Sequence, residues 1–492
     1  MKAVIYICFY AFMGMLTIPG CHSPGVEKIP NESPSFIIIL VDDLGKEWIS
    51  STGADSIQTP FIDKLAKMGV SFDNAYSMPQ CTPSRVALLT GTYPYHNGWI
   101  NHFDVPRWGH GARFDPERNQ TFARVLREAG YKTCAAGKWQ INDFRLEPDA
   151  MEEAGFDAFC MWTGGEGGNE KVSEHRYWDP YIHTKEGSRV YKGKFGPDIF
   201  TNFIIRFMQK NRDSPMLIYY PMVLTHTPFV HTPLEPTAST PMEKHKAMVR
   251  YTDHLVGRLV MAMEDLGIRE NSYLIFTTDN GTAGSVIGSR NGILIRGGKT
   301  FLTENGVNAP FIVNAPGHVK SGTVSGALVD FTDVFPTLVH LAGIPIDEEI
   351  PLDGHSFAPA LMSDVHTGRS SILAMGSHPG RIGDDGMIRN WYPFRDRVLR
   401  DKRYKVYVDT LKQIHRLYDL LKDPQEKENL IGESDMEEIL GSFEKVVKEL
   451  PDEDRHPDYK RLDSSYYNVP PEYLERSHKK LLGRSNMSAP VK

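Results

Sequence analysis

Four short runs of apolar residues, many of them β-branched, are each followed by polar residues that can do chemistry. Such runs are typical of strands buried on both faces of a parallel sheet. Because ligands of open α/β sheets bind where the strands end, we expect the four ends to converge on one site. The runs are 35–41, 131–136, 216–220 and 273–278, followed respectively by Asp42 and Asp43, Gly137 to Trp139, Thr225 to Pro228, and Asp279 to Gly281.

Amphipathic helical patterns lie between these runs. Alternating strands and helices predict a mostly parallel sheet covered on both faces. After about residue 368 the pattern changes, and 403–408 alternates like an exposed strand of a smaller subdomain. The predicted helices are 59–68, 121–128, 200–209, 248–266 and 330–343.

The first 20 residues predict an export signal. Lys2 precedes an almost wholly apolar stretch, Ala3 to Ile18, which is shorter than the about 20 residues that a membrane span needs. The stretch leads into a lipoprotein-like cleavage box that makes Cys21 the lipidated first mature residue. Ordinary secretion with cleavage nearby is the alternative. We therefore expect an exported bacterial lipoprotein, periplasmic or on the outer surface, that meets the membrane only through its lipid.

The 492 residues are enough for several domains. We expect a signal at 1–20, a catalytic domain at 34–367, a subdomain at 368–460 and a tail at 461–492. The net charge of -7 argues against a nucleic-acid partner, because proteins that bind nucleic acids carry basic faces. Of the five cysteines, Cys134 and Cys160 are the two that could form a disulfide in an exported protein, and the sequence leaves this pairing open.

Cys81 stands just ahead of another helical pattern. Pro83 suits the first helical position and Gly91 the C-terminal cap. Cys81 would then lie at the positive end of the helix dipole, where anions are favoured, with the charge of Arg85 one turn further on. A nucleophile beside an anion site is a catalytic arrangement. A low-pKa thiol without this role and an inert buried thiol are the alternatives.

Two oxygen-rich segments indicate a cation site. The adjacent carboxylates of Asp42 and Asp43 repel each other unless a cation neutralises them. Asp279 and Asn280 supply further oxygen ligands, and an all-oxygen set favours calcium or magnesium. Solvated turns are the alternative for both segments.

The run from Cys81 to Gly91 resembles the signature of the type I sulfatases, in which Cys-x-Pro-x-Arg is followed by Leu-Thr-Gly. The resemblance extends from about Pro34 to Leu430, with the motifs in the family's order. It implies the alkaline-phosphatase-like α/β sandwich: a large, mostly parallel central sheet and a smaller C-terminal α+β subdomain with an antiparallel sheet. The family-like segment from Leu417 to Leu430 is interpreted as structural.

In that family the cysteine is oxidised to formylglycine (3-oxoalanine) by a maturation enzyme. Its hydrate attacks the sulfur of a sulfate ester, and one divalent cation, usually Ca²⁺, assists. Arg85, Lys138 and Lys299 would stabilise charge, while His226 or Lys299 would protonate the leaving alcohol. By resemblance the catalytic residues are Cys81, Arg85, Lys138, His226 and Lys299, and the metal ligands are Asp42, Asp43, Cys81, Asp279 and Asn280.

The sequence departs from the family at Gln140, where a histidine usually follows Gly-Lys-Trp. Glutamine cannot take a proton at neutral pH. Either another group, with His102 and His96 as candidates, takes that role, or turnover is slow, or the subfamily works without it. We still expect a working enzyme, because the other matched positions are intact. A second departure, Glu304 to Gly306, affects a loop more than the chemistry.

The substrate is expected to be a sulfated carbohydrate, because aromatic residues beside polar ones suit sugar rings as well as ordinary packing. Two clusters have this composition: Trp162, His175, Arg176, Tyr177, Trp178 and Tyr181, and then His378, Arg381, Arg389, Trp391 and Arg395. The predicted substrate-binding residues are Gln140, His102, Trp162, His378 and Arg381.

A sulfatase acting on sulfated carbohydrate is the leading hypothesis. The alternatives are a phosphonate monoester or phosphodiester hydrolase of the same superfamily, transfer to an acceptor other than water, and a catalytically silent glycan-binding lipoprotein. A plain cysteine hydrolase leaves the acidic segments without a function.

Overall fold

The computed structural model describes residues 33–99, 118–142, 147–162, 175–363, 369–377 and 388–457, and the single positions 114, 116, 144, 381, 382, 384 and 385. The predicted signal, the lipidated Cys21, the tail, His102, His378 and the side chain of Arg381 lie outside the described residues. No helix within the described ranges has the length and apolar character of a membrane span.

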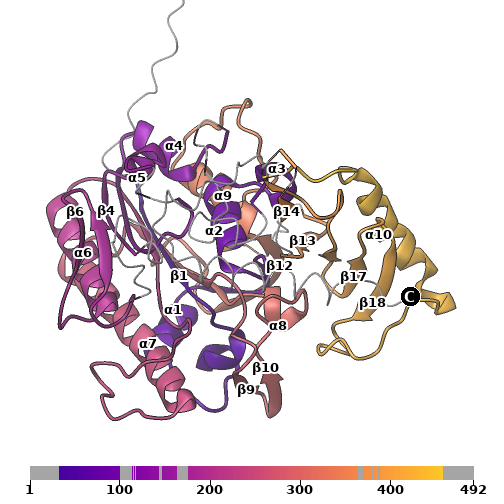
Figure 1. Ribbon diagram of the computed structural model, residues 1–492, viewed down its shortest axis with the longest axis horizontal. Coiled ribbons are helices and arrows are strands. Elements are labelled where there is room, and N and C mark those ends of the chain that lie inside the picture. Colours follow the sequence, from indigo (N-terminus) through magenta and orange to yellow (C-terminus); the bar gives the residue numbers. More distant parts are fainter. Residues whose placement is uncertain are drawn as a thin grey trace, which may run out of the picture.

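A sheet forms the centre of the main domain (Figure 1). It has ten strands, in the order β12-β2-β11-β8-β1-β7-β3-β4-β5-β6. The five strands from β8 to β4 run parallel, and β11 and the β5–β6 pair are antiparallel to their neighbours. The strands are β1 Ser35–Val41, β2 Val70–Tyr76, β3 Lys132–Lys138, β4 Ala158–Trp162, β5 Tyr181–Thr184, β6 Gly187–Val190, β7 Met216–Pro221, β8 Ser272–Thr278, β11 Phe311–Asn314 and β12 Thr323–Asp330.

Strand β1 contributes to a hydrophobic core on each face of the sheet. Phe36, Ile38 and Leu40 pack into the core that α2, α4 and α9 cover. Ile37 and Ile39 pack into the other core, which α1, α6 and α7 cover, as alternation of side chains along a strand requires. The helices are α1 Pro60–Lys67, α2 Cys81–Thr90, α3 Pro94–Asn97, α4 Phe122–Glu128, α5 Ala150–Glu153, α6 Gly196–Asn211, α7 Pro241–Asp265, α8 Glu304–Val307 and α9 Val334–Leu341.

The predicted elements are present, with shifted ends. β1 spans the predicted residues, but β3 runs on to Lys138, which is therefore the last residue of the strand. α7 begins seven residues before its predicted start, because Thr240 and Glu243 form a capping box ahead of the apolar pattern. The predicted 330–343 helix is a short 3₁₀ turn, Phe331–Asp333, followed by α9.

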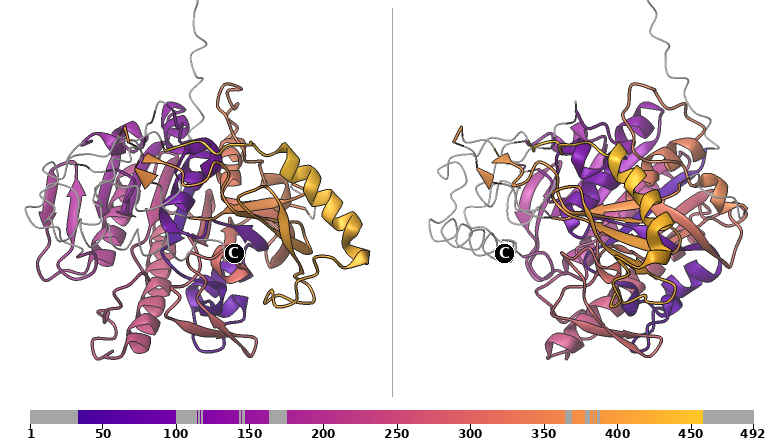
Figure 2. Two further views of the ribbon diagram at one scale, coloured as in Figure 1. Left: turned by 45° about the vertical axis from the view of Figure 1, so that its right-hand side comes forward. Right: turned by 90° about the vertical axis from the view of Figure 1, so that its right-hand side faces the viewer.

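The C-terminal subdomain is a four-stranded antiparallel sheet, β13-β16-β17-β18, with α10 packed against it (Figure 2). The prediction that 403–408 is an exposed strand was wrong. β17 lies inside the sheet, and Lys405, Val406 and Val408 are fully buried, because the strand also packs toward the main domain. The elements are β13 Ile372–Met375, β16 Arg397–Arg400, β17 Tyr404–Val408, β18 Ile414–Asp419 and α10 Glu437–Glu449, and two small hairpins comprise β9 Ile287–Arg290 with β10 Ile293–Arg296 and β14 Arg381–Ile382 with β15 Ile388–Arg389.

Cys134 on β3 and Cys160 on β4 are both buried and both free. The disulfide that the sequence left open is therefore not formed. Burial raises the pKa of each thiol, which keeps both protonated and unreactive.

Candidate active site

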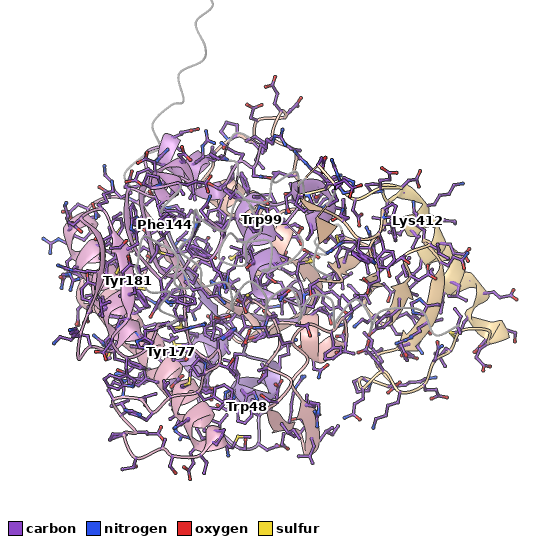
Figure 3. All side chains as sticks on the ribbon, viewed as in Figure 1. Trp48, Trp99, Phe144, Tyr177, Tyr181 and Lys412 are labelled. Atoms are coloured by element: carbon purple, nitrogen blue, oxygen red, sulfur yellow. The ribbon has the colours of Figure 1, made fainter. Side chains whose placement is uncertain are left out.

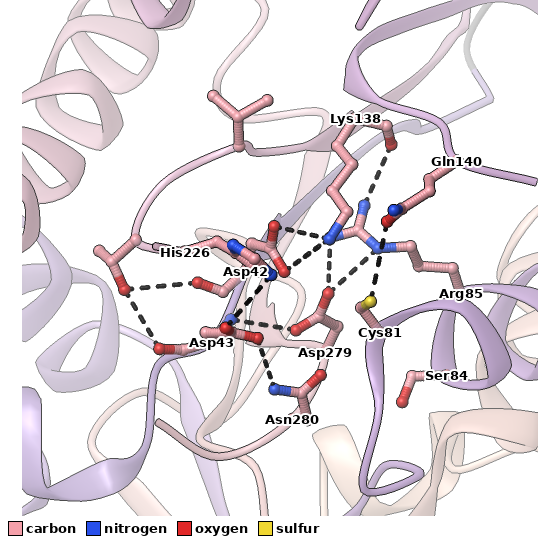
Figure 4. A network of polar contacts seen from close by, with 12 residues as sticks. Asp42, Asp43, Cys81, Ser84, Arg85, Lys138, Gln140, His226, Asp279 and Asn280 are labelled. Carbon is pink, nitrogen blue, oxygen red and sulfur yellow. Dashed lines mark hydrogen bonds and ion pairs between the residues drawn. The ribbon is translucent and has the colours of Figure 1, made fainter. Parts of the chain in front are cut away.

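The two oxygen-rich segments meet because β1 and β8 are neighbours. They pair in parallel, with Val41 opposite Thr278, so the residues that follow both strands leave the sheet at the same edge. The backbone N–H of Asp43 donates to Asp279 Oδ1 at 3.1 Å, and Asn280 Nδ2 donates to Asp43 Oδ1 at 2.8 Å (Figure 4).

Helix α2 delivers Cys81 to this edge of the sheet. The helix begins at Cys81, so Pro83 is its third residue and not its first as predicted. This costs no hydrogen bond, because the first four N–H groups of a helix have no partner within the helix. Gly91 caps the helix as expected, with φ of 69°. The Cys81 sulfur lies within 4.8 Å of carboxylate oxygens of Asp42 and Asp279, and 3% of the residue is exposed.

Arg85 binds the carboxylate layer from one helical turn further on. Its Nε and Nη2 donate to Asp279 Oδ2 at 3.1 and 2.6 Å, and its Nη1 donates to the carbonyl of Lys138 at 3.1 Å. The guanidinium is buried, and such charge-assisted bonds hold its plane in one orientation.

Two lysines pair with the tandem aspartates. Lys138 Nζ donates to both oxygens of Asp42, at 2.9 and 2.7 Å, and Lys299 Nζ lies 2.7 Å from the Asp43 carboxylate. His226 Nδ1 donates to the carbonyl of Thr227 at 2.5 Å, and its Nε2 lies 3.7 Å from Asp43. The neutral ring therefore turns its unprotonated nitrogen toward the site.

Burial and charge set the protonation states. Burial alone would raise the pKa of Asp42, but Lys138 and the other nearby cations lower it well below its ordinary value. Burial, together with the charge of Asp42, raises the pKa of Asp279 to about 7. Burial and then Lys299 lower the pKa of His226 well below its ordinary value, so this ring is neutral at neutral pH.

The residues present fit a hard divalent cation. Asp42, Asp43 and Asp279 crowd three carboxylates together, and a cation would relieve their repulsion. The Asn280 Oδ1 atom is buried and has no hydrogen-bond partner within the described residues, although its amide nitrogen has two. Carboxylate oxygens together with a free amide oxygen form the donor set that calcium and magnesium prefer.

Gln140 lies beside the candidate nucleophile. The Cys81 thiol donates a weak hydrogen bond to Gln140 Oε1 across 3.8 Å. The residue is buried and has φ of 54°, in the left-handed region that few side chains adopt. It lies two residues after the end of β3, so the strand that presents Lys138 also presents Gln140.

The structure therefore brings together all five predicted catalytic residues, all five predicted ligands and Gln140. Their individual roles stay predictions. His96 lies in α3 with its ring against Asp353, and Arg389 pairs with Asp385. Trp162 is fully buried at the end of β4, and its ring carries the guanidinium of Arg176 at 4.0 Å.

Tyr177 and Trp178 of the first cluster pack against the loop that carries His226. The hydroxyl of Tyr177 donates to the carbonyls of Val223 and His226, and Trp178 Nε1 donates to the carbonyl of His231 at 3.1 Å. Figure 3 shows Tyr177 and Tyr181 on the side of the molecule opposite Lys412, which lies in the subdomain.

Arg176 is a charged residue at this site that was not among the predicted site residues. One of its Nη atoms lies 4.0 Å from Asp42 Oδ2, and 5% of the residue is exposed. From the sequence it was assigned only to an aromatic cluster that suits either sugar binding or packing, because Arg176 and Asp42 are far apart in the chain and no motif links them.

Two family models match the chain. The model described as Sulfatase covers residues 34–344, and the one described as N-sulphoglucosamine sulphohydrolase, C-terminal, covers residues 297–453. Arylsulfatase J of Mus musculus is 31% identical over 376 residues, which cover 73% of this chain and 61% of the relative. The Ulvan-active sulfatase of Formosa agariphila is 26% identical over 459 residues, 87% of this chain and 83% of the relative.

A solved structure confirms the predicted fold. The crystal structure of Ps i-CgsB in complex with k-i-k-neocarrahexaose has a TM-score of 0.71 and 24% identity, and the match covers 91% of this chain and 99% of the other. The large, mostly parallel sheet and the smaller antiparallel subdomain are thus a known architecture. Because the Sulfatase model spans well over half of the residues, this chain belongs to the sulfatase family.

Proposed function

We propose that the protein hydrolyses sulfate esters of sulfated carbohydrates, with a formylglycine made from Cys81 and one Ca²⁺ ion. The observation that carries the proposal is the Cys81 sulfur at the N-terminus of α2, within 4.8 Å of two buried carboxylates and flanked by buried cations. The family membership supports the reaction. One relative is active on ulvan, and one structural neighbour binds a neocarrahexaose, which supports a carbohydrate substrate.

The oxidised residue 81 would supply an oxygen nucleophile as its hydrate, and the cation would lower the pKa of that hydroxyl and screen the sulfate. Asp42, Asp43, Asp279 and the free Asn280 oxygen would hold the cation. The buried N-terminus of α2 orients the side chain of residue 81 toward them.

The cations around the carboxylates would stabilise charge on the sulfuryl oxygens. Arg85 is fixed by three hydrogen bonds, whereas Lys138 and Lys299 are flexible side chains that can turn from the aspartates to a bound sulfate. Removing one preorganised donor of this kind costs roughly 10²- to 10³-fold in kcat.

Proton transfer to the leaving alcohol falls to Lys299 or His226. Burial would lower the pKa of Lys299, but Asp43 and the other negative groups raise it, so the amine carries a proton. His226 is neutral and turns its unprotonated Nε2 toward the site, so in this state it has no proton to give and Lys299 is the better candidate for the donor.

We further propose export and lipid anchoring through the N-terminal segment, and modification of Cys81 by a formylglycine-generating enzyme. Because the Cys81 residue is 3% exposed, that enzyme has to act before the chain folds around it.

The test is to express the chain with and without a formylglycine-generating enzyme and to measure sulfate release from aryl and saccharide sulfates. We expect activity only in the co-expressed protein, together with the aldehyde mass at residue 81. Cys81→Ala should abolish release, whereas Cys134→Ala, which changes a buried thiol outside the site, should retain it. Full release by the Cys81→Ala protein would contradict the proposal. Faster turnover of phosphonate esters than of sulfate esters would favour the superfamily alternative.

A further inference from the structure

Arg176 is a buried cation with unused hydrogen-bond donors. Its Nε and Nη1 atoms are buried and have no hydrogen-bond partner among the described residues. Its closest acid within the described part of the chain is Asp42, at 4.0 Å, which is an ion-pair distance and too long for a hydrogen bond. Asp42 already accepts two hydrogen bonds from Lys138. A buried guanidinium left in this state costs free energy until an anion binds to it.

The segment around Arg176 fixes where the guanidinium lies. Its plane covers the buried ring of Trp162, with the carbon of the guanidinium 4.0 Å from the ring centre. The next residue, Tyr177, donates its hydroxyl to the carbonyls of Val223 and His226. The side chain is therefore ordered in advance, which reduces the entropy lost when a ligand binds.

The charges of the site balance without Arg176. With a cation bound, Asp42, Asp43 and Asp279 would carry three negative charges, and Arg85, Lys138 and Lys299 carry three positive ones. A divalent cation adds two positive charges, which a sulfate monoester and an ionised nucleophile would match. His226 is neutral. One positive charge, that of Arg176, has no counterpart in this set.

We propose that Arg176 binds a second anionic substituent of the saccharide, a sulfate or a carboxylate close to the ester that is cleaved. The site would then select polyanionic substrates over sugars that carry a single sulfate. The inference rests on the proposed function, since it names the class of substrate for the same site. A guanidinium presents its N–H donors in planar pairs, and this geometry matches both anions.

The test measures binding with two aryl sulfates that differ in one negative charge. Full-length Cys81→Ser protein loaded with Ca²⁺ is titrated in a calorimeter with 4-nitrophenyl sulfate and with 4-nitrocatechol sulfate, at a pH where the ring hydroxyl of the latter is ionised. Inorganic sulfate is titrated as the ligand for the sulfuryl position alone. The same titrations are made with Arg176→Gln and Arg176→Lys added, and thermal midpoints verify that each variant folds.

We expect Arg176→Gln to weaken the binding of nitrocatechol sulfate by roughly 10- to 100-fold, the value of a charge-assisted hydrogen bond. The affinity for nitrophenyl sulfate should fall by a several-fold smaller factor. The affinity of the Arg176→Lys variant for nitrocatechol sulfate should lie between that of Arg176→Gln and that of the protein with Arg176. Arg189→Gln is the matched control, because Arg189 also covers an aromatic ring, that of Tyr191, but is exposed.

An equal loss for both esters and for inorganic sulfate would overturn the inference, because Arg176 would then bind the transferred sulfuryl group. No change in any affinity would also overturn it and leave Arg176 with a structural role. If the Cys81→Ser protein that retains Arg176 binds neither inorganic sulfate nor nitrophenyl sulfate, the proposed function itself is contradicted. Failure of the proposed function is thereby distinguished from failure of the inference on Arg176.

Discussion

The Cys81 thiol and the Gln140 amide oxygen face each other across 3.8 Å at the centre of the site. Gln140 is held in the left-handed backbone region, with φ of 54°, so its position beside Cys81 is built into the turn that follows β3. A group that can donate and accept hydrogen bonds, but cannot take a proton, therefore lies next to the candidate nucleophile.

Gln140→His should add a titrating group to the reaction. Histidine tolerates the left-handed region and has an ordinary pKa near 6.5. With Ca²⁺ saturating at every pH, we expect the kcat of the matured variant to acquire a pH dependence between about pH 6 and 7 that the native protein lacks. Gln140→Ala should lower kcat without adding this dependence. Identical pH profiles for the His variant and the native enzyme would show that residue 140 takes no part in proton transfer.

Ca²⁺ should stabilise the protein through the carboxylates at the ends of β1 and β8. At 100 times its Kd a ligand stabilises the folded state by about 2.7 kcal/mol, so the thermal midpoint should rise with Ca²⁺ and fall again with a chelator. Asp279→Asn should remove most of this response. Asp253→Asn is the control, because that buried carboxylate accepts from the N–H of Ile62, outside the site.

The affinity for Ca²⁺ should fall as the pH is lowered. Without the cation, burial and the charge of Asp42 raise the pKa of Asp279 to about 7. Below that pH a proton competes with the ion for the same carboxylate. Calcium titrations by calorimetry at a series of pH values between 5 and 8 check this, and a constant affinity across that range would contradict it.

Glu304→Gln should loosen the contact between the two parts of the protein. Glu304 accepts from Arg400 at 2.5 Å, from Lys405 at 3.1 Å and from Asn308 at 2.9 Å. Removing one member of a buried ion pair costs about 3–5 kcal/mol. A lower thermal midpoint and faster proteolysis of the subdomain are expected. Glu235→Gln, which breaks a more exposed pair with Arg250, should cost at most about 1 kcal/mol.

His245 should make the fold sensitive to acid. The ring lies between Trp48 and Phe229, and neither nitrogen has a hydrogen-bond partner among the described residues. Burial lowers its pKa from 6.5 to about 4. Between these two values the unfolded chain binds a proton that the folded one does not, so stability falls as pH falls, by about 3 kcal/mol in all.

His245→Phe should remove that part of the acid sensitivity. The thermal midpoints of the native protein and the variant, measured from pH 7 to pH 4, should converge or cross as the pH is lowered. His415→Phe, at an exposed position, should follow the native curve. A constant difference between native and His245→Phe proteins at every pH would contradict the prediction.

The positions of the site residues follow from local patterns. The apolar runs of β1 and β8 and the polar residues that follow them are evident in the sequence. Parallel pairing of the two strands brings Asp42 and Asp279 to one edge of the sheet. The N-terminal region of α2 was equally visible from Pro83 and Gly91. Local signals sufficed here, because each functional side chain lies within a few residues of the start or end of an element.

What could not be predicted depends on pairings between distant segments. β11 lies between β2 and β8 and is antiparallel to both, an arrangement that no pattern within its four residues indicates. Arg176 lies beside Asp42 although the two residues are far apart in the chain, and no local pattern indicates this contact. The buried contacts of Glu304 join segments about 100 residues apart, so the sequence indicated no more than an altered loop.

The Glu304 contacts also set the order in which the protein can become functional. Lys299, which pairs with Asp43, lies five residues before Glu304 on the segment that Arg400 and Lys405 hold. During synthesis Cys81 leaves the ribosome early, while the cations that anchor the Lys299 segment are made about 300 residues later. The contacts that hold the Lys299 segment are therefore completed by the last part of the chain, which would leave an interval in which Cys81 is accessible to the modifying enzyme proposed above.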